Sequence, residues 1–437
     1  MILAYPRVLA AGTLTEVLLR APKPLFTGGA LTALFTACEV FPAGKAASEG
    51  EMISGFEVFH TTGSPARLPL QIINPFECRV AVRCPSEQEY VLRLCRQEGE
   101  RLVLLDTACL YAVGPELCGL RPYKGDLHMH SYFSDGEDSP AAMAAACRRK
   151  GLDFMALTDH GKFEPSRRLQ AQFAPMRELA FQIYTGEEIH MPWHQAHILN
   201  IGGRRSVNEV FAKDRTAFLA AVEARRGSVC VPEGVDEYQY LAALWAFDEV
   251  RAAGGLSVFC HPYWRRAQGY DLSAAFTEAM LAARPFDAIE LISGYAKRQT
   301  DSNLLQLARF SELAPRPPIV GVSDAHAAEA AEVPEGEYLL GAFYTFVLAL
   351  SPRLDDITGA VRAGRSAAAE CQQNEQLHVY GPYRLVKYFL FLARSFFPEH
   401  DALALEESAA LQRFARGEQA AGAARALEAL YHEAFAW

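Results

Sequence analysis

The segment Asp126 to Gly136, with the sequence DLHMHSYFSDG, carries three side chains suited to binding a metal ion. His128 and His130 are two residues apart, so on a strand both imidazoles point to the same face. Asp135 follows in a Ser-Asp-Gly turn and supplies a carboxylate. Taken alone, the histidine pair is weak evidence, because two polar residues on a solvated strand face would give the same pattern.

Further residues of metal-binding types recur along the chain, most of them directly after a short apolar run. They lie in Thr158 to His160, Gly186 to Glu188, His197, Cys260 to Pro262 and Ser323 to His326. The repetition of donors at the ends of apolar runs favours a metal centre over a solvated strand face.

The elements that carry these donors follow a strand-helix-strand rhythm from Tyr123 onward, which predicts parallel β/α units. Strands are expected at 153–157, 181–184, 256–260, 318–322 and 343–349. Helices are expected at 140–150, 213–226, 240–253, 272–284, 303–313 and 355–365. Donors at the carboxyl ends of parallel strands are typical of β/α barrels, whose active sites lie there.

Three regions follow from these patterns. Residues 1–122 contain short strands, such as 68–73 and 89–94, and predict a β-rich domain without catalytic spacing. Residues 123–370 form the expected barrel, and residues 371–437 the expected helical extension. The alanine-rich segment 420–434 is expected either to pack on the chain or to dimerise, so a homo-oligomer stays open.

Composition limits the class of protein. The chain has 437 residues, half of them hydrophobic, which suffices for two or three domains. No apolar run reaches the roughly 18 residues of a membrane span, and the start makes a poor signal peptide. Ten cysteines without a CxxC pair are typical of buried thiols in a reducing compartment. The net charge of -10 argues against a broad nucleic-acid interface. We expect a cytoplasmic protein with no stable nucleic-acid complex and no membrane association.

The ordered motifs DLHMHSYFSDG, LTDHG, TGEE, HILNIG, CHP and SDAH resemble those of the polymerase and histidinol phosphatase (PHP) superfamily of metal-dependent phosphoesterases. The resemblance spans about Tyr123 to Arg365. It implies an α/β fold, a distorted (β/α)7 TIM-like barrel, with up to three divalent ions at the strand carboxyl ends. The implied ligands are His128, His130, Asp135, His160, Glu188, His197, His261, Asp324 and His326, with Glu188, Asp324 and His261 as catalytic residues.

The implied ligand set agrees with inorganic chemistry. Its imidazoles and carboxylates suit zinc, manganese or iron, whereas calcium prefers oxygen ligands and structural zinc usually uses cysteines. Nine donors are too many for one ion, so we expect two or three. Cys260 adjoins His261, but neighbours on a strand face opposite sides, so we expect it to be buried packing.

Some positions have rivals. Glu187 and Glu188 are adjacent and only one can face the barrel axis; the family pattern of glycine, any residue, glutamate favours Glu188. His190 and His194 compete with His197, which we favour. Asp126 and Asp159 precede expected ligands and are expected to accept an imidazole N–H and so fix its tautomer; solvated aspartates are the alternative.

The implied reaction is hydrolysis of a phosphate ester of a small metabolite or nucleotide through a metal-bridging hydroxide. Two alternatives use the same residues: hydrolysis of a carboxylic or carbamic ester, and a non-catalytic, metal-stabilised accessory module. The entry YKGDLH after a β-rich region also resembles carbaryl-hydrolysing enzymes. Four cations on neighbouring loops could hold distal phosphate oxygens: Lys162, Arg265, Arg266 and Arg298.

Overall fold

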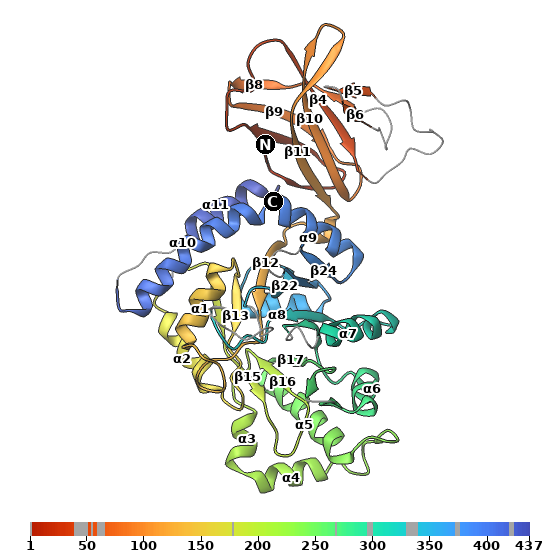
Figure 1. Ribbon diagram of the computed structural model, residues 1–437, viewed down its shortest axis with the longest axis vertical. Helices are drawn as coiled ribbons and strands as arrows, with labels where there is room; N and C mark the ends of the chain where they lie inside the picture. The colour runs from red at the N-terminus through yellow and green to blue at the C-terminus, as the bar shows by residue number, and fades with distance from the viewer. Residues whose placement is uncertain are drawn as a thin grey trace. The chain divides into compact units, whose positions relative to one another are not determined.

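The computed structural model describes residues 2–38, 51–53, 56–58, 66–176, 179–266, 269–294, 300–328, 340–371, 376–418 and 424–437. The chain divides into two compact units (Figure 1). The first comprises Met1–Leu120, Leu390–Glu399 and Ala426–Trp437, and the second comprises Arg121–Phe389 and His400–Arg425. None of the helices in the described part of the chain is long and apolar enough to cross a membrane.

The first unit is built from two sheets, as expected for a β-rich region. One sheet has the order β1 (Leu3–Tyr5), β3 (Leu14–Arg20), β9 (Glu77–Arg83), β8 (Gln71–Asn74). The other has the order β2 (Val8–Ala10), β11 (Arg101–Val113), β10 (Gln88–Glu98), β4 (Ala30–Ala37), β7 (Ala66–Leu68). A short pair, β5 (Glu51–Ile53) and β6 (Phe56–Val58), completes the strands described there. Alternating side chains, such as Val80 and Val82 of β9, are buried in the core of this unit.

The single strand expected at 68–73 is wrong, because this stretch belongs to β7 and β8, which lie in different sheets. Pro69 stands between them and has no N–H to continue a ladder. The last residues described also join the first unit: Val8 forms a parallel bridge with Phe435, and Arg7 donates its backbone N–H to the Ala434 carbonyl at 2.8 Å.

The second unit is α/β and holds two larger sheets. The first has the order β14 (Gln182–Tyr184), β13 (Phe154–Ala156), β12 (Arg121–Asp126), β22 (Phe343–Ala349), β23 (Ser366–Glu370), β24 (His378–Tyr380). The second has the order β15 (Gly186–Ile189), β16 (Ile198–Ile201), β17 (Leu256–Phe259), β20 (Ala288–Ser293), β21 (Ile319–Val322). Isolated parallel bridges, Met129 to Ala325 and His160 to Glu188, connect strand ends of the two sheets.

The expectation of uniformly parallel strands is wrong, because both sheets are mixed. β12, β13 and β14 are parallel, as are β17, β20 and β21. However, β16 is antiparallel to both β15 and β17, and β22 is antiparallel to both β12 and β23. β24 is a strand within the segment 371–437 that was expected to be helical.

The α-helices of the described residues belong to both units. They are α1 (Pro140–Arg149), α2 (Glu164–Phe173), α3 (Asn208–Lys213), α4 (Arg215–Glu223), α5 (Glu237–Ala253), α6 (Ala274–Ala283), α7 (Thr300–Glu312), α8 (Leu354–Arg362), α9 (Tyr383–Ser395), α10 (Phe397–Ala415) and α11 (Ala424–Ala434). α1 begins as its sequence predicts: the Ser139 hydroxyl accepts the Ala142 N–H at 3.2 Å, and Pro140 occupies the first turn. Residues 420–423 of the helix expected at 420–434 lie outside the described residues.

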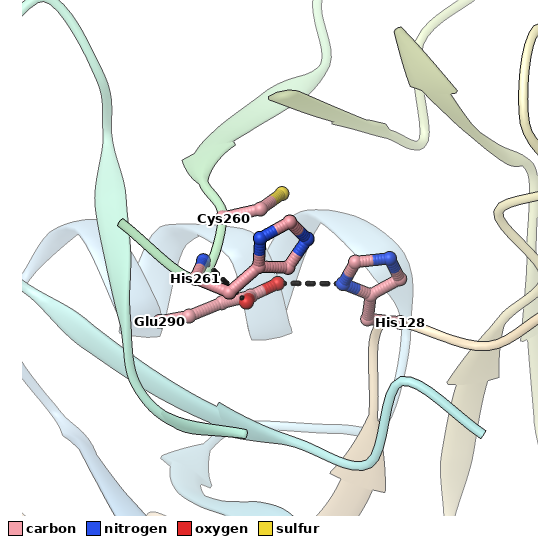
Figure 2. A group of neighbouring side chains, drawn as sticks. All are labelled: His128, Cys260, His261 and Glu290. Atoms are coloured by element: carbon pink, nitrogen blue, oxygen red, sulfur yellow. Dashed lines mark hydrogen bonds and ion pairs between the residues drawn. The ribbon is translucent and has the colours of Figure 1, made fainter. Parts of the chain in front are cut away.

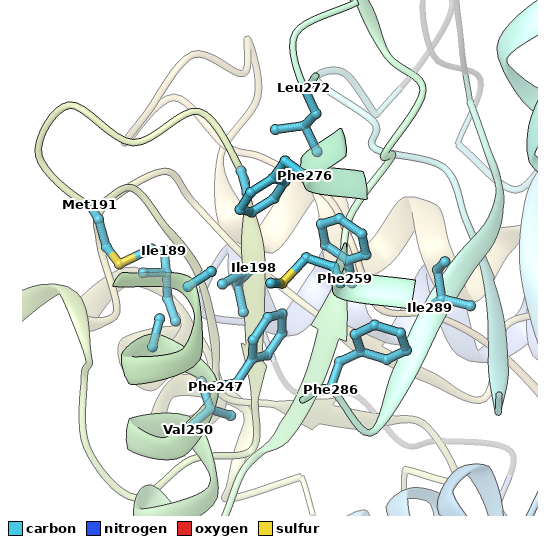
Figure 3. Packing of buried hydrophobic residues seen from close by; sticks show 14 of the residues in the cluster. Ile189, Met191, Ile198, Phe247, Val250, Phe259, Leu272, Phe276, Phe286 and Ile289 are labelled. Carbon is cyan, nitrogen blue, oxygen red and sulfur yellow. The ribbon is translucent and has the colours of Figure 1, made fainter. Parts of the chain in front are cut away.

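Aromatic and aliphatic side chains hold β16, β17 and β20 against the helices that follow them (Figure 3). Phe247 and Val250 of α5 and Phe276 of α6 are buried in the same cluster as Ile198 and Phe259. Burial of one such side chain contributes roughly 1.5–3 kcal/mol. This packing fixes the strands whose ends carry the candidate site.

A buried ionic network ties α10 to α1 and β13 within the second unit. Arg148 donates to Glu407 at 2.7 Å and to Asp153 at 3.0 Å, and His400 Nε2 lies 2.7 Å from the same Asp153 oxygen. The side chains of Arg148, His400 and Glu407 are fully buried. Breaking one such pair leaves an uncompensated buried charge, at a cost of about 3–5 kcal/mol.

Candidate metal centre

The structure brings all nine expected ligands together. His128 and His130 follow β12, His160 follows β13, His261 follows β17 and Asp324 follows β21. The two histidines of the HxH pair therefore lie just beyond the expected strand. Their alternation persists because Met129 between them bridges Ala325 and accepts the Thr158 N–H at 2.9 Å.

Glu188 of β15 lies at the centre of the cluster and is fully buried. Its Oε1 lies 2.7 Å from His197 Nδ1 and 3.5 Å from His261 Nε2. Its Oε2 lies 2.7 Å from His160 Nδ1, 3.2 Å from His128 Nε2 and 3.4 Å from His130 Nε2. One carboxylate thus faces two sets of imidazoles, one set on each oxygen.

Two aspartates extend the cluster to either side. Asp324 Oδ1 lies 3.0 Å from His130 Nε2 and 3.3 Å from His128 Nε2. Asp135, which is half-exposed, places Oδ2 3.3 Å from both His160 Nε2 and His326 Nε2. The two carboxylates therefore share His130 and His160 with Glu188.

Potential ligand atoms fall into four overlapping groups in the described part of the chain. These are His130, Asp135, His160 and His326; His160, Glu188, His190 and His197; His128, His130 and Asp324; and His128, Cys260, His261 and Glu290. Within each group the atoms lie within 4.8 Å of one another, as the ligands of one ion do.

Unpaired polar atoms at the centre fit bound cations. Both oxygens of Glu188, and the facing nitrogens of His128, His160 and His197, are buried without a hydrogen-bond partner among the described residues. A buried polar group without a partner costs about 1–3 kcal/mol. Lone pairs that converge without bonding to one another are what a metal ion requires, so the donor set fits divalent metals.

The electrostatics keep these carboxylates ionised. Burial alone would raise the pKa of Glu188, but His197, His128 and His160 hold it well below its usual range. Burial alone would lower the pKa of His160, but Glu188 and Asp135 raise it to about 10. Bound divalent cations would keep these carboxylates ionised in the same way, by placing positive charge beside them.

Glu187 faces the opposite side of β15 from Glu188. Its Oε1 accepts from Asn200 Nδ2 at 2.8 Å and from the Val207 N–H at 2.6 Å. Its Oε2 accepts from Ser206 Oγ at 2.6 Å and from Asn208 Nδ2 at 2.8 Å. Glu187 therefore anchors the segment that leads into α3 and points away from the cluster.

The two histidines that compete with His197 occupy different places in the structure: His190 lies in the cluster and His194 does not. His194 is half-buried and lies away from the cluster, with Nε2 2.7 Å from the Gln239 carbonyl. His190 is exposed but joins the cluster, with its ring centre 4.1 Å from that of His197 and 4.2 Å from that of His160. His190 and His197 therefore both lie within reach of the ion that Glu188 would hold.

Sequence reasoning missed Glu290 and misplaced Cys260. Glu290 lies in β20, and its Oε1 is 2.7 Å from His128 Nδ1 (Figure 2). Cys260 is fully buried, as expected, but it belongs to the same group, although strand alternation predicted the opposite face. The alternation fails because β17 ends at Phe259 and His261 has a φ of 23°. A charged residue within the apolar run Ala288–Ser293 was the available signal for Glu290.

The role expected for Asp126 and Asp159 is wrong, because neither aspartate accepts an imidazole N–H among the described contacts. Asp126 accepts the backbone N–H of His128 at 3.2 Å and of Ser323 at 3.1 Å. Asp159 accepts the Ser131 N–H and the Ser134 hydroxyl, at 2.8 and 2.7 Å. Both aspartates hold the loops that carry the ligands, while Glu290 contacts an imidazole nitrogen.

A cavity of about 260 Å³ adjoins His160 at the next residue, Gly161, and is also lined by Phe133, Lys162 and Arg168. Lys162 donates its ammonium to the Phe133 carbonyl. Arg265 pairs with Asp301 at 2.9 Å. Arg298 and the side chain of Arg266 lie outside the described residues.

Several known proteins are similar to parts of this chain. It is 51% identical over 53 residues to the DNA polymerase/3'-5' exonuclease PolX of Bacillus subtilis, a match that covers 12% of this chain and 9% of that protein. A two-domain protein from Bacteroides vulgatus with a PHP-like metal-dependent phosphoesterase domain is 22% identical, with a TM-score of 0.38, over 57% of this chain and 65% of that one. An amidohydrolase from Chromobacterium violaceum with bound sulfate is 20% identical, with a TM-score of 0.32, over 46% of this chain and 87% of that one.

The PHP domain family model matches residues 126–296. The match begins with the DLHMH segment and includes the strands and loops that carry Asp135, His160, Glu188, His197 and His261. Residues 126–296 are therefore a PHP domain.

Proposed function

We propose that this protein is a metal-dependent phosphoesterase that hydrolyses a phosphate ester of a small metabolite or nucleotide. The observation that carries the proposal is the convergence of five imidazoles on the two unpaired oxygens of Glu188. Bound divalent ions, which we propose to be two or three of zinc, manganese or iron, would activate water and neutralise charge developing on phosphorus.

The residues of the chain have distinct parts in this proposal. Glu188 would hold ions with both oxygens, because different imidazoles face each one. Asp324 and His261 would complete these sites and, with Glu188, are the proposed catalytic residues. The group of Asp135, His160 and His326 would form the outer site, since Asp135 is half-exposed.

The finer fold proposed is a distorted barrel of seven β/α units. The bridges from Met129 to Ala325 and from His160 to Glu188 support it, because they connect the two sheets of the second unit at strand ends. In such a barrel, the ligands would share the carboxyl-terminal face, where variable loops shape substrate binding.

Phosphorus is the favoured target for two reasons. Phosphoryl transfer places negative charge on several oxygens, and a centre with several metal ions can neutralise all of them. Hydrolysis of an ester or a carbamate develops only one oxyanion, which needs fewer ions. The PolX relative is a 3'-5' exonuclease by name, and such enzymes break phosphodiester bonds. The expected ligands include three carboxylates, and three divalent ions would leave the pocket positively charged. Glu290 adds a further buried carboxylate, so this positive charge is smaller than the nine expected ligands alone would give.

A cytoplasmic location is also proposed. All ten cysteines are thiols, which is usual for a reducing compartment. We further propose a small-molecule phosphate ester, rather than a stably bound nucleic acid or membrane, as the partner of the site.

The test is a substrate panel on metal-loaded protein: p-nitrophenyl phosphate, bis(p-nitrophenyl) phosphate, a short single-stranded oligonucleotide and p-nitrophenyl acetate. His128→Ala serves as the blank for contaminating hydrolases. We expect a phosphate substrate to be cleaved with two or three bound metal equivalents measured by elemental analysis. Acetate cleavage orders of magnitude faster than any phosphate would support the ester-hydrolase alternative, and metal binding without cleavage of a broad metabolite panel would support the accessory module.

A further inference from the structure

Glu290 is a buried carboxylate that contacts two of the proposed ligands without being one of the nine. It is 1% exposed. Its Oε1 lies 2.7 Å from His128 Nδ1, and its Oε2 accepts the backbone N–H of His261 at 2.9 Å (Figure 2). Each carboxylate oxygen therefore meets a different ligand-bearing segment.

The contact with His128 determines which ring nitrogen can bind metal. An ionised carboxylate accepts hydrogen bonds only, so the proton of a neutral His128 ring resides on Nδ1. The lone pair is then on Nε2, which is the nitrogen that faces Glu188 at 3.2 Å and Asp324 at 3.3 Å. A carboxylate in this position also makes the imidazole a stronger electron donor.

The contact with His261 supports an unfavourable backbone conformation. His261 has a φ of 23°, where side chains other than glycine are strained. The hydrogen bond from its N–H to Glu290 stabilises this turn. The turn directs the His261 ring toward the cluster, with Nε2 3.5 Å from Glu188 Oε1.

We propose that Glu290 is a positioning residue that fixes the tautomer of His128 and the backbone of His261, and thereby raises the affinity of the ion that His128 holds. This inference rests on the proposed metal centre. Glu290 itself is not a ligand in this proposal, because both of its oxygens already face N–H donors.

The rival arrangement is an ion bound by Cys260, Glu290, His128 and His261 together, since their ligand atoms lie within 4.8 Å of one another. Such an ion would displace both hydrogen bonds of Glu290 and would use the Nδ1 that now faces it. It would also have a thiolate ligand, which gives cobalt a characteristic charge-transfer absorption.

The experiment compares cobalt binding by the full-length wild type, Glu290→Gln and the matched control Cys260→Ala, in a competition titration against a chelator. Glutamine keeps the size of the side chain, but its one carbonyl oxygen can serve only one of the two N–H groups. We expect Glu290→Gln to weaken one cobalt equivalent by about 10–100-fold, while the remaining equivalents and the Tm of the metal-free protein match the wild type. Cys260→Ala should bind as the wild type does.

If Glu290→Gln binds every cobalt equivalent with the affinity of the wild type, the inference is overturned. A sulfur-to-cobalt absorption in the wild type that disappears in Cys260→Ala would overturn it in favour of the rival site. If Glu290→Gln does not fold, ¹⁵N NMR of the histidine rings in the zinc-loaded wild type decides: a proton on Nδ1 of His128, assigned with His128→Gln, is expected, and a proton on Nε2 contradicts the proposal. A wild type that binds no cobalt would overturn the metal centre itself, a result distinct from equal binding by both proteins.

Discussion

Glu187 and Glu188 are adjacent buried carboxylates with different partners, imidazoles for Glu188 and loop donors for Glu187. We predict that Glu188→Gln lowers the bound metal and abolishes turnover, because an amide is a poor metal ligand. Glu187→Gln should instead lower the stability of the fold, by about 1–3 kcal/mol. The NH2 group of the new glutamine would face N–H and O–H groups that donate to the carboxylate in the wild type, and these donors would lose their acceptor. Elemental analysis and chemical unfolding distinguish the two effects; metal loss confined to Glu187→Gln would reverse the assignment.

Gly136 permits a close approach that shapes the loop carrying Asp135. A Cβ at Gly136 would lie 2.6 Å from the His130 carbonyl oxygen. We predict that Gly136→Ala displaces this loop, costs about 1–3 kcal/mol and loses the metal equivalent that Asp135, His160 and His326 are proposed to hold.

The matched control is Gly359→Ala in α8, where a Cβ would have nothing within 4 Å. It should stabilise the protein by about 0.5–1 kcal/mol, since alanine is the better helix former, and leave metal content unchanged. Equal metal content in both variants would show that Asp135 is not a ligand.

At this scale, donors that recur directly after apolar runs indicated where a metal centre lies, but the nine side chains that the structure gathers were selected by the resemblance to the PHP superfamily. Residue order along the sequence could not select Glu290, since a single sequence does not show which strand neighbours meet across the sheet. The misplaced Cys260 has a different cause: strand alternation holds only until the backbone turns, and the positive φ of His261 is invisible in the residue types.

The elements that carry the site depend on a buried ionic network, and two of its members, His400 and Glu407, are remote from the site in the sequence. Burial would raise the pKa of Asp153, but His400, Arg148 and the Lys124 N–H lower it to about 2. Because an unfolded aspartate titrates near pH 3.9, the folded state gains stability from this carboxylate above that pH. The gain is lost as the pH falls toward 2.

We therefore predict that metal-free wild type exceeds Asp153→Asn in unfolding free energy most strongly above about pH 4, and that the difference shrinks by about 2 kcal/mol toward pH 2. Urea unfolding at a series of pH values measures it. A difference that is constant over this range would mean that Asp153 is not the titrating group.

Helix positions were predictable where end signals coincide: Ser139, Pro140 and Gly151 bound α1, which ends within one residue of its predicted end. Strand direction was not predictable. β22 is as apolar as a central parallel strand, and its antiparallel pairing with β12 is set by the chain path between them.

The two units are discontinuous in sequence, so the expected boundary after residue 370 divides the second unit. We predict that a chain ending at residue 370 loses the cooperative unfolding transition of this unit, because Asp153 loses His400 and Arg148 loses Glu407. A chain ending at residue 425 retains both and should keep the transition and its metal. Differential scanning calorimetry compares them; a normal transition in the shorter chain would show that α10 is dispensable.

The bridge between Val8 and Phe435 has a consequence for biosynthesis. On a ribosome, β2 emerges several hundred residues before the segment that pairs beside it. At roughly 5–20 residues per second, that interval lasts tens of seconds. During this time the edge of the nascent sheet is open to other chains, so the protein depends on whatever shields exposed strand edges until the segment around Phe435 has been made.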